Sequence, residues 1–211
     1  MINNAIQLKA KVRNVSGGDA KTAKAYIRIF FMERFMERVS LSLYRDSFII
    51  KGGMLVSSLL GINLRSTMDI DTTVKALPLT IEDVSGIIRE ICDIELYDNV
   101  TFGITNVETI MEDFDYPGVR VHLEALLDRL RQPVKIDIST DDVITPGAVE
   151  YEYKLMFEDR SIYIYTYNVE TTLAEKSQTI INRGIANTRM RDFYVKLSRR
   201  DIYNVILSVK G

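Results

Sequence analysis

Residues 47–75 read SFIIKGGMLVSSLLGINLRSTMDIDTTVK. The apolar run at 48–50 predicts a buried strand, and the glycine pair after it predicts a tight turn. Residues 54–60 have the apolar spacing of a short helix, and the chain then returns into a second strand over 69–74. We interpret the rest of the chain around this unit of strand, turn, helix and strand.

The second strand carries two aspartates, Asp69 and Asp71, on either side of Ile70. Because successive side chains on a strand point to opposite faces, both carboxylates should project together while Ile70 faces the core. Adjacent carboxylates repel each other unless a cation lies between them, and Mg²⁺ (or Mn²⁺) prefers oxygen ligands. Gly52 and Gly53 would let the backbone approach a phosphate at the start of the helix. This context favours a nucleoside triphosphate and metal site over the alternative, a solvated strand edge.

Two runs of residues resemble the signature of the nucleotidyltransferase superfamily: Lys51-Gly52-Gly53, and LRSTMDID at 64–71. The narrower pattern Arg-x-Thr-x-Asp-Ile-Asp resembles the AbiEii family of nucleotidyltransferase-like toxins, from bacterial toxin–antitoxin and phage-abortive systems. The resemblance implies an α+β nucleotidyltransferase fold, a mixed β-sheet flanked by helices with a helical C-terminal part. It also implies that Lys51, Gly52, Gly53, Arg65 and Thr67 contact the nucleotide.

A third carboxylate is expected on a neighbouring strand. In the run VKIDIS at 134–139, Asp137 lies between two isoleucines, the setting in which the superfamily places a third acidic residue. If this strand lies beside 69–74, Asp137 could complete the metal site with Asp69 and Asp71 or act as a general base. The alternative is a surface aspartate on an edge strand.

The C-terminal part extends the resemblance. A helix predicted over 169–184 carries Lys176 and Arg183, which lie on nearly one line because they are seven residues apart. Two such cations usually form a solvated face, but Ala174-Glu175-Lys176 and Arg183 resemble the third motif of the family, which implies that Lys176 meets the nucleotide phosphates. The run RMRDFY at 189–194 resembles a fourth motif, in which Arg191 would contact the nucleotide and Asp192 would help activate the acceptor. Met54 and Val195 depart from the family pattern.

The whole composition is that of a soluble globular protein. The 211 residues are 46% hydrophobic and 27% charged, with a net charge of −2, which argues against a general polyanion binder. The single Cys92 cannot form an internal disulfide, and the single His122 excludes a multi-histidine metal site. We find no signal peptide pattern or membrane-spanning run, and we expect a cytoplasmic protein without membrane contact.

We expect three parts: an N-terminal helical segment packed on the core (1–46), a nucleotidyltransferase core sheet domain (47–167), and a helical region that completes the active-site cleft (168–211). A long amphipathic helix is predicted over 20–44. We expect four of its charged residues to face solvent: Glu33, Arg34, Glu37 and Arg38. Later segments predict a helix to about residue 92 and strands over 101–111, 119–127, 134–139 and 162–167.

The resemblance implies a Mg²⁺-dependent toxin that transfers a nucleotide from an NTP to an acceptor, expected to be the 3′ end of tRNA. A cognate antitoxin encoded nearby is the implied protein partner. Two alternatives remain open from the sequence. One is a catalytically silent NTP-binding or partner-binding module on the same fold, and the other is an enzyme that nucleotidylates a protein hydroxyl.

Overall fold

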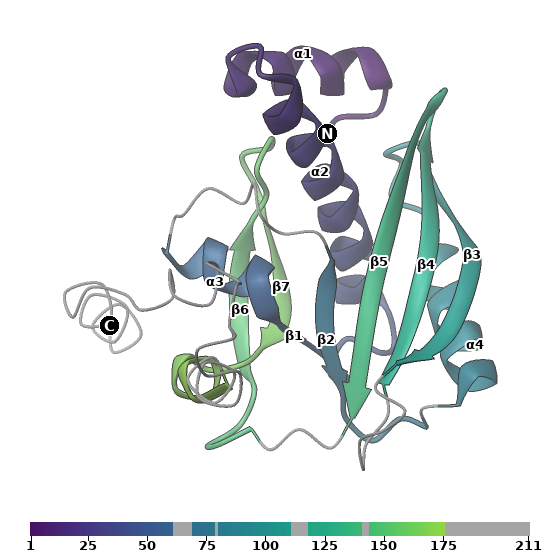
Figure 1. The fold of residues 1–211 in the computed structure, drawn as a ribbon, viewed down its shortest axis with the longest axis vertical. Coiled ribbons are helices and arrows are strands. Elements are labelled where there is room, and N and C mark those ends of the chain that lie inside the picture. The colour runs from purple at the N-terminus through teal and green to yellow at the C-terminus, as the bar shows by residue number, and fades with distance from the viewer. Residues whose placement is uncertain (61–68, 79, 111–117, 141–143, 176–211) are drawn as a thin grey trace, which may run out of the picture.

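The computed structural model describes residues 1–60, 69–78, 80–110, 118–140 and 144–175. These residues form a seven-stranded mixed sheet with helices packed against it, so the α+β prediction is confirmed (Figure 1). Several predicted site residues lie outside the described residues: Arg65, Thr67, Lys176, Arg183, Arg191 and Asp192. The same holds for the helical C-terminal part beyond residue 175.

The described elements agree closely with the predicted ones. The helices are α1 (Ala5–Ser16), α2 (Ala20–Leu41), α3 (Gly52–Leu60) and α4 (Ile81–Cys92). The strands are β1 (Phe48–Lys51), β2 (Ile70–Val74), β3 (Val100–Ile110), β4 (Gly118–Leu127), β5 (Leu130–Thr140), β6 (Val149–Lys154) and β7 (Ser161–Thr166). A further helix begins at residue 169 and is described as far as Glu175.

Local capping explains where the helices begin. Asn4, Asp19 and Thr80 each precede a helix, and each side chain accepts a hydrogen bond from a backbone N–H of the first turn. Those N–H groups have no partner within the helix, so the caps stabilise the starts of α1, α2 and α4. Gly17 ends α1 in the left-handed conformation, at a φ of 59°, which a glycine adopts without strain.

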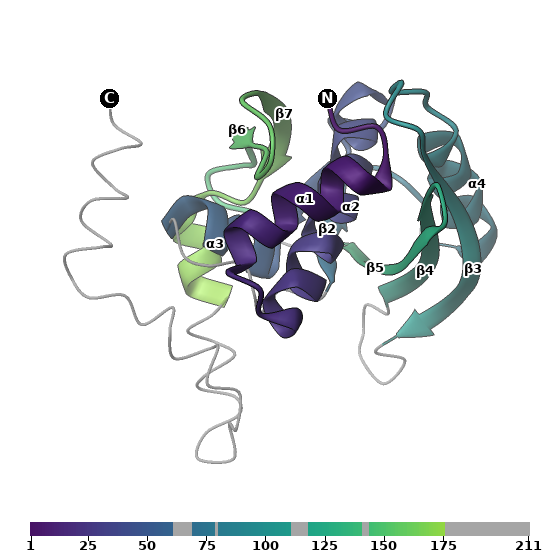
Figure 2. The same ribbon diagram turned by 90° about the horizontal axis from the view of Figure 1, so that it is seen from above.

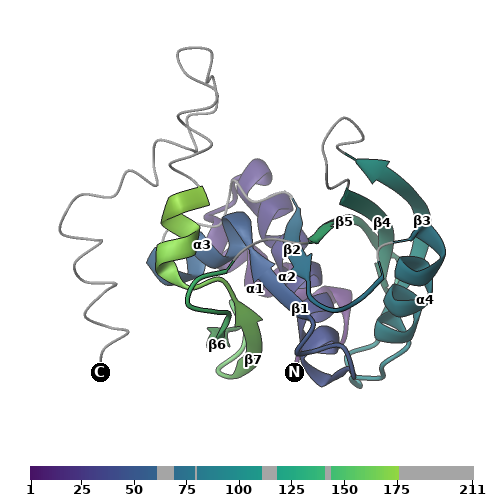
Figure 3. The same ribbon diagram turned by 90° about the horizontal axis from the view of Figure 1, so that it is seen from below.

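The strand order is β3-β4-β5-β2-β1-β7-β6. β2 lies in the middle, antiparallel to β1 and parallel to β5, so the condition on which the role of Asp137 depended, that 134–139 lies beside 69–74, is met. The sheet curves around α2, with β3, β4 and β5 on one side of the helix and β6 and β7 on the other (Figures 1 and 3). α2 packs against β5 and β7, and α4 packs against β3 and β4.

The sheet buries one face of its strands in this core. On β4 and β5, the alternating Val121, Leu123, Ile136 and Ile138 are almost fully buried, together with α2 side chains such as Phe30 and Phe35. Residues of α1 and α2 belong to the same buried cluster as the sheet, whereas the expected division into three parts stays a prediction. The other face of β2, β4 and β5 carries polar and charged side chains, and the candidate site lies on this open face.

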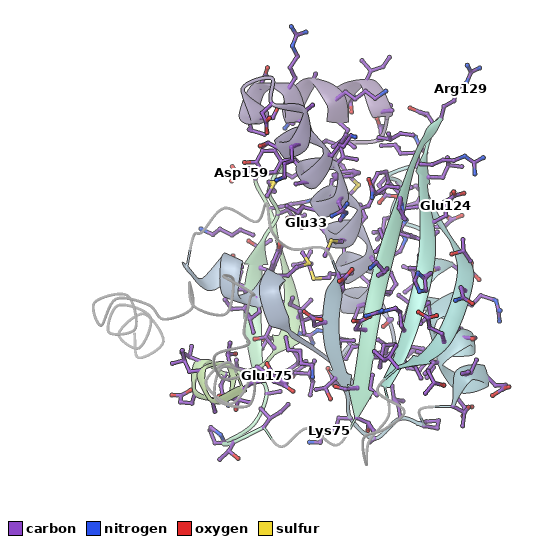
Figure 4. All side chains as sticks on the ribbon, viewed as in Figure 1. Glu33, Lys75, Glu124, Arg129, Asp159 and Glu175 are labelled. Carbon is purple, nitrogen blue, oxygen red and sulfur yellow. The ribbon has the colours of Figure 1, made fainter. Side chains whose placement is uncertain are left out.

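Our prediction for the charged side of α2 is wrong. Glu33, Arg34, Glu37 and Arg38 are between 0% and 5% exposed, and Figure 4 shows Glu33 in the interior. The curved sheet and the β6–β7 connection cover this side of α2 and bring it partners. For example, Arg38 binds Asp98 through both carboxylate oxygens, at 3.0 and 3.2 Å, and buried charges of this kind require such pairing.

β5 begins at Leu130, four residues before the predicted start. Pro133 therefore lies within the strand, opposite Glu124 of β4. β2 pairs with β5 only from Ile136 onward, so among the described residues no strand pairs with this edge of β5 at Pro133. A proline, which has no N–H to donate, is tolerated at such an edge position.

The single cysteine and the single histidine of the chain both lie on described elements. Cys92 is buried at the end of α4, and burial raises the pKa of its thiol to about 12. His122 lies on β4, where Nε2 is 3.0 Å from Glu108 Oε1. Among the helices that the structure describes, none combines the length and the apolar character that a membrane span requires.

Candidate active site

The site is built on a register that aligns charged residues across five strands. Lys51 of β1 lies opposite Asp71 of β2, which lies opposite Asp137 of β5. Asp137 in turn lies opposite Arg120 of β4, and Arg120 lies opposite Glu108 of β3. Residues paired in this way point to the same face of a sheet. We call these five residues the charged row; its two aspartates are neighbours at its centre.

Asp71 is packed directly against the turn between β1 and α3. Gly52 has a φ of 72°, and a Cβ atom built on it would lie 1.9 Å from Asp71 Oδ2. Both the backbone angle and the missing side chain are therefore required at this position. The glycine of the Gly-Gly motif lets the carboxylate approach the backbone where the helix begins, which the sequence had indicated only as room for a phosphate.

Asp69 is the second carboxylate of the Asp-x-Asp motif. Ile70, between the two aspartates, is 0% exposed and lies in the core, so the predicted alternation is confirmed. Asp69 Oδ1 lies 3.3 Å from Lys135 Nζ, an ion pair without the geometry of a hydrogen bond. Within the described residues, this oxygen is buried and has no hydrogen-bond partner. A buried carboxylate oxygen in that state is suited to a cation.

Asp137 is held by Arg120. The guanidinium donates from Nε to Oδ1 and from Nη2 to Oδ2, both at 2.7 Å, in a two-pronged interaction. These hydrogen bonds raise the pKa of Arg120, and the nearby charges of Asp137 and Asp69 raise it further. Asp137 thus lies opposite Asp71 in register, and both of its oxygens accept hydrogen bonds from Arg120.

Lys51 connects the end of β1 to β5 and to the helix that begins at residue 169. Its Nζ donates to Ser139 Oγ at 2.9 Å and lies 3.8 Å from Glu175 Oε1. The ammonium also lies over the Tyr167 ring, 5.6 Å from its centre. Glu175, labelled in Figure 4, immediately precedes Lys176, so this contact brings the start of the predicted third motif to the charged row.

The donor set can be tested against a divalent metal ion. Among the described residues, no three acidic, histidine or cysteine side chains converge in a way that could hold an ion. The metal-ligand roles of Asp69, Asp71 and Asp137 therefore stay predictions. Two carboxylates fit Mg²⁺, which is commonly bound by one or two carboxylates together with substrate phosphates.

Sequence reasoning did not find Arg120 as a partner of Asp137 or Lys135 as a partner of Asp69. Arg120 occupies an outward position in the alternating segment 119–127, which predicts its face but not its neighbour. The partner depends on the antiparallel register of β4 and β5. Lys135 is two residues from Asp137, so the sequence showed that the two side chains share one face of the strand. The contact of Lys135 with Asp69 could not be predicted, because it depends on the parallel pairing of β2 and β5.

Comparisons with known proteins find solved structures that resemble this chain. JHP933 from Helicobacter pylori has a crystal structure similar to this one, with a TM-score of 0.50 and 14% identity over 80% of this chain. The chain spans about three-fifths of that protein, 62% of its length. A structure of ANT(2")-Ia in complex with adenylyl-2"-tobramycin matches 87% of this chain and 97% of its own, with a TM-score of 0.46 and 11% identity. These likenesses concern the fold alone, and a comparison with curated proteins gave no significant match.

A family model covers most of the chain. The model of the nucleotidyl transferase AbiEii toxin of type IV toxin–antitoxin systems matches residues 34–194. The matched region contains the β1–α3 turn, the Asp-x-Asp motif and Asp137, and it continues through the predicted third and fourth motifs. The chain belongs to the AbiEii family of nucleotidyl transferase toxins.

Proposed function

We propose that this chain is a metal-dependent nucleotidyltransferase that acts as a toxin. In the proposed reaction, an acceptor hydroxyl attacks the α-phosphorus of an NTP, the bond to the β-phosphate oxygen breaks, and pyrophosphate leaves. The acceptor oxygen loses its proton to a base and gains a nucleoside monophosphate. The main support is the neighbouring pair of Asp71 and Asp137 in the charged row, beside the Gly52 turn.

Asp69 and Asp71 are the proposed metal ligands, and Gly52 and Gly53 are the proposed phosphate-binding turn. A bound divalent ion would neutralise the negative charge that the phosphates carry during transfer. The first turn of α3 offers backbone N–H groups next to Asp71, and such groups stabilise phosphate oxygens. Lys51, held by Ser139 and Glu175, supplies a positive charge at the same end of the row.

Asp137 is proposed as the base that accepts the proton of the acceptor hydroxyl, or as a further metal ligand. Arg120 donates hydrogen bonds to both oxygens of Asp137, so it fixes the direction of the carboxylate. Each oxygen accepts one hydrogen bond from Arg120 and keeps a second lone-pair site, with which Asp137 could accept a proton or bind an ion. Arg120 is therefore a positioning residue for Asp137 in this proposal.

The remaining proposed roles concern residues outside the described part of the chain. Lys176 and Arg183 would neutralise the triphosphate, Arg65, Thr67 and Arg191 would contact the nucleotide, and Asp192 is an alternative group for activating the acceptor. These assignments are supported by the family motifs. We further propose the 3′ end of tRNA as the acceptor and an antitoxin encoded nearby as the partner that controls the protein, because the family consists of type IV toxins.

Transfer of label tests the proposal directly. The full chain is incubated with each α-labelled NTP, Mg²⁺ and total tRNA, and label on RNA is the expected result. Asp71→Asn should lower the transfer rate at least about hundredfold, since it replaces a charged carboxylate that is a proposed metal ligand. The matched control is Asp159→Asn, an exposed aspartate at the β6–β7 connection (Figure 4), which should leave the rate unchanged. Full activity of Asp71→Asn would contradict the metal-site assignment.

Other outcomes of the same assay separate the alternatives. Metal-dependent NTP binding without label on any RNA or protein would indicate a catalytically silent module. Label on a protein instead of RNA would indicate nucleotidylation of a protein hydroxyl. In cells, expression of the chain should arrest growth, and Asp71→Ala should relieve the arrest if transfer is its cause.

A further inference from the structure

Positive charge is concentrated at one end of the described structure. Residues 1–28 contain six lysines and arginines and one acidic residue, Asp19, a net charge of +5. The other 183 residues contain 21 lysines and arginines and 28 acidic residues, a net charge of −7. The positively charged segment forms α1 and the first turns of α2, and α1 lies across α2 at one end of the molecule (Figures 1 and 2).

Four of these cations form two short rows in the helical hairpin. Lys9 and Arg13 are four residues apart on α1, and Lys21 and Lys24 are three residues apart on α2. Side chains with these spacings lie on one face of a helix, about 6 and about 4.5 Å apart along its axis. All four residues are exposed. We call them the basic hairpin.

The basic hairpin has no internal counter-charge. In the described part of the chain, no ion pair involves any of its four side chains. Like charges three or four residues apart destabilise a helix by a few tenths of a kcal/mol per pair, so the two rows do not help the fold. By contrast, the neighbouring Lys11 donates from Nζ to Phe157 O at 2.8 Å and has a structural contact.

The hairpin presents its charges on a fixed framework. α1 buries its apolar face, Ala5, Leu8 and Val12, within the molecule, and Gly17 turns the chain into α2. Because that face is already covered, α1 has no continuous apolar surface with which to enter a membrane interface. The exposed apolar residues of α1, Ile6 and Val15, are separated along the helix. The available chemistry is therefore that of a rigid cationic surface, which suits a polyanion.

We infer that the basic hairpin binds the phosphate backbone of the RNA acceptor. The inference rests on the proposed function, because that function makes RNA the acceptor. The hairpin shares no residue with the charged row, so the two surfaces can be tested separately. Rows of lysine and arginine with no other partner are the usual means by which a protein of near-neutral net charge binds nucleic acid locally.

The salt dependence of RNA binding tests the inference without any need for catalysis. Binding of fluorescein-labelled bulk tRNA to the full chain is measured by anisotropy between about 50 and 200 mM salt. Replacing Lys9, Arg13, Lys21 and Lys24 by Gln should reduce the slope of log K against log salt by about three to four, roughly one for each lost phosphate contact. Binding should weaken at least about tenfold at the low-salt end.

A matched pair of double variants separates a local contact from an effect of net charge. Lys9→Gln with Lys24→Gln removes one cation from each row, and the slope should fall by about two. The double variant Lys75→Gln with Arg89→Gln removes the same charge from exposed positions, one directly after β2 and one on α4. Its slope of log K against log salt should equal that of the original chain. Circular dichroism and thermal unfolding confirm that each variant folds. Equal effects of the two doubles would overturn the inference.

RNA binding by the basic hairpin and nucleotide transfer are measured separately, so failure of the inference can be distinguished from failure of the proposed function. If the quadruple variant binds tRNA as the original chain does, the inference is wrong, whether or not nucleotide transfer occurs. If binding depends on the hairpin but no label is transferred, the inference stands and the transfer proposal fails. Hairpin-dependent binding to phosphatidylserine vesicles, together with unchanged RNA binding, would overturn the inference in favour of a membrane surface.

Discussion

Replacement of Gly52 by alanine should damage stability and activity together. A residue with a Cβ atom pays about 1–2 kcal/mol for the left-handed conformation that Gly52 adopts at a φ of 72°. The new Cβ would also lie 1.9 Å from Asp71 Oδ2 and 2.7 Å from Asp71 Cβ, so the Asp71 carboxylate must rotate away and the backbone must shift to separate the two Cβ atoms. An off-rotamer side chain costs about 0.5–1.5 kcal/mol more. These two terms give a minimum of about 2–3 kcal/mol, which for a chain of this size lowers the melting temperature by at least roughly 5–10 °C.

Gly17→Ala is the matched control. Gly17 is also left-handed, at a φ of 59°, but a Cβ there meets no atom within 4 Å. This variant should therefore lose only the backbone part, about 1–2 kcal/mol, and should keep its transfer rate. Gly52→Ala should lose transfer about hundredfold as well, because displacement of a catalytic group by about 1 Å has that effect.

Thermal unfolding and label transfer measured on both variants decide the matter. The reasoning is refuted if Gly52→Ala melts at the same temperature as Gly17→Ala and transfers nucleotide at the original rate. A loss of stability without loss of transfer would show that Asp71 is not part of the reacting centre, whatever the strain at the turn.

Three further predictions concern buried groups. Arg38→Ala strands Asp98 in the core and should lower the free energy of unfolding in urea by about 3–5 kcal/mol, whereas Arg89→Ala, at an exposed position, should change it little. Burial raises the pKa of Glu33 to about 8 from an unfolded value of 4.5, so the folded state holds a proton that the unfolded state releases. Stability should therefore fall as pH rises from about 4.5 to 8, and Glu33→Gln should flatten that fall; an unchanged slope in urea titrations at pH 5, 6.5 and 8 would contradict this. Cys92, whose thiol pKa burial raises to about 12, should react with a thiol reagent only as the protein unfolds, and rapid labelling of the native protein would disprove it.

The elements and the Asp-x-Asp geometry could be predicted because their signals are local. Alternation placed Asp69 and Asp71 on one face with Ile70 in the core, and the Gly-Gly pair marked the turn before α3. The adjacency of β2 and β5 followed from the family resemblance, and the register then placed Asp71 opposite Asp137.

The contacts that could not be predicted depend on distant pairing. The charges of α2 follow a helical pattern that usually marks a solvated face, yet the curvature of the sheet buries that face and supplies partners such as Asp98 for Arg38. No local pattern encodes that curvature. Similarly, Arg120 and Asp137 are joined by a hairpin register rather than by their spacing in the chain.

The charged row also has a consequence for synthesis of the protein. Its members come from β1 to β5, and the parallel pairing of β2 with β5 joins segments more than sixty residues apart. A slip of β5 by one residue would turn Asp137 into the core and bring an isoleucine to the open face. A ribosome-bound chain that has not yet extruded β5 therefore holds only half of the acidic pair, and the proposed site can form only after β5 has joined the sheet.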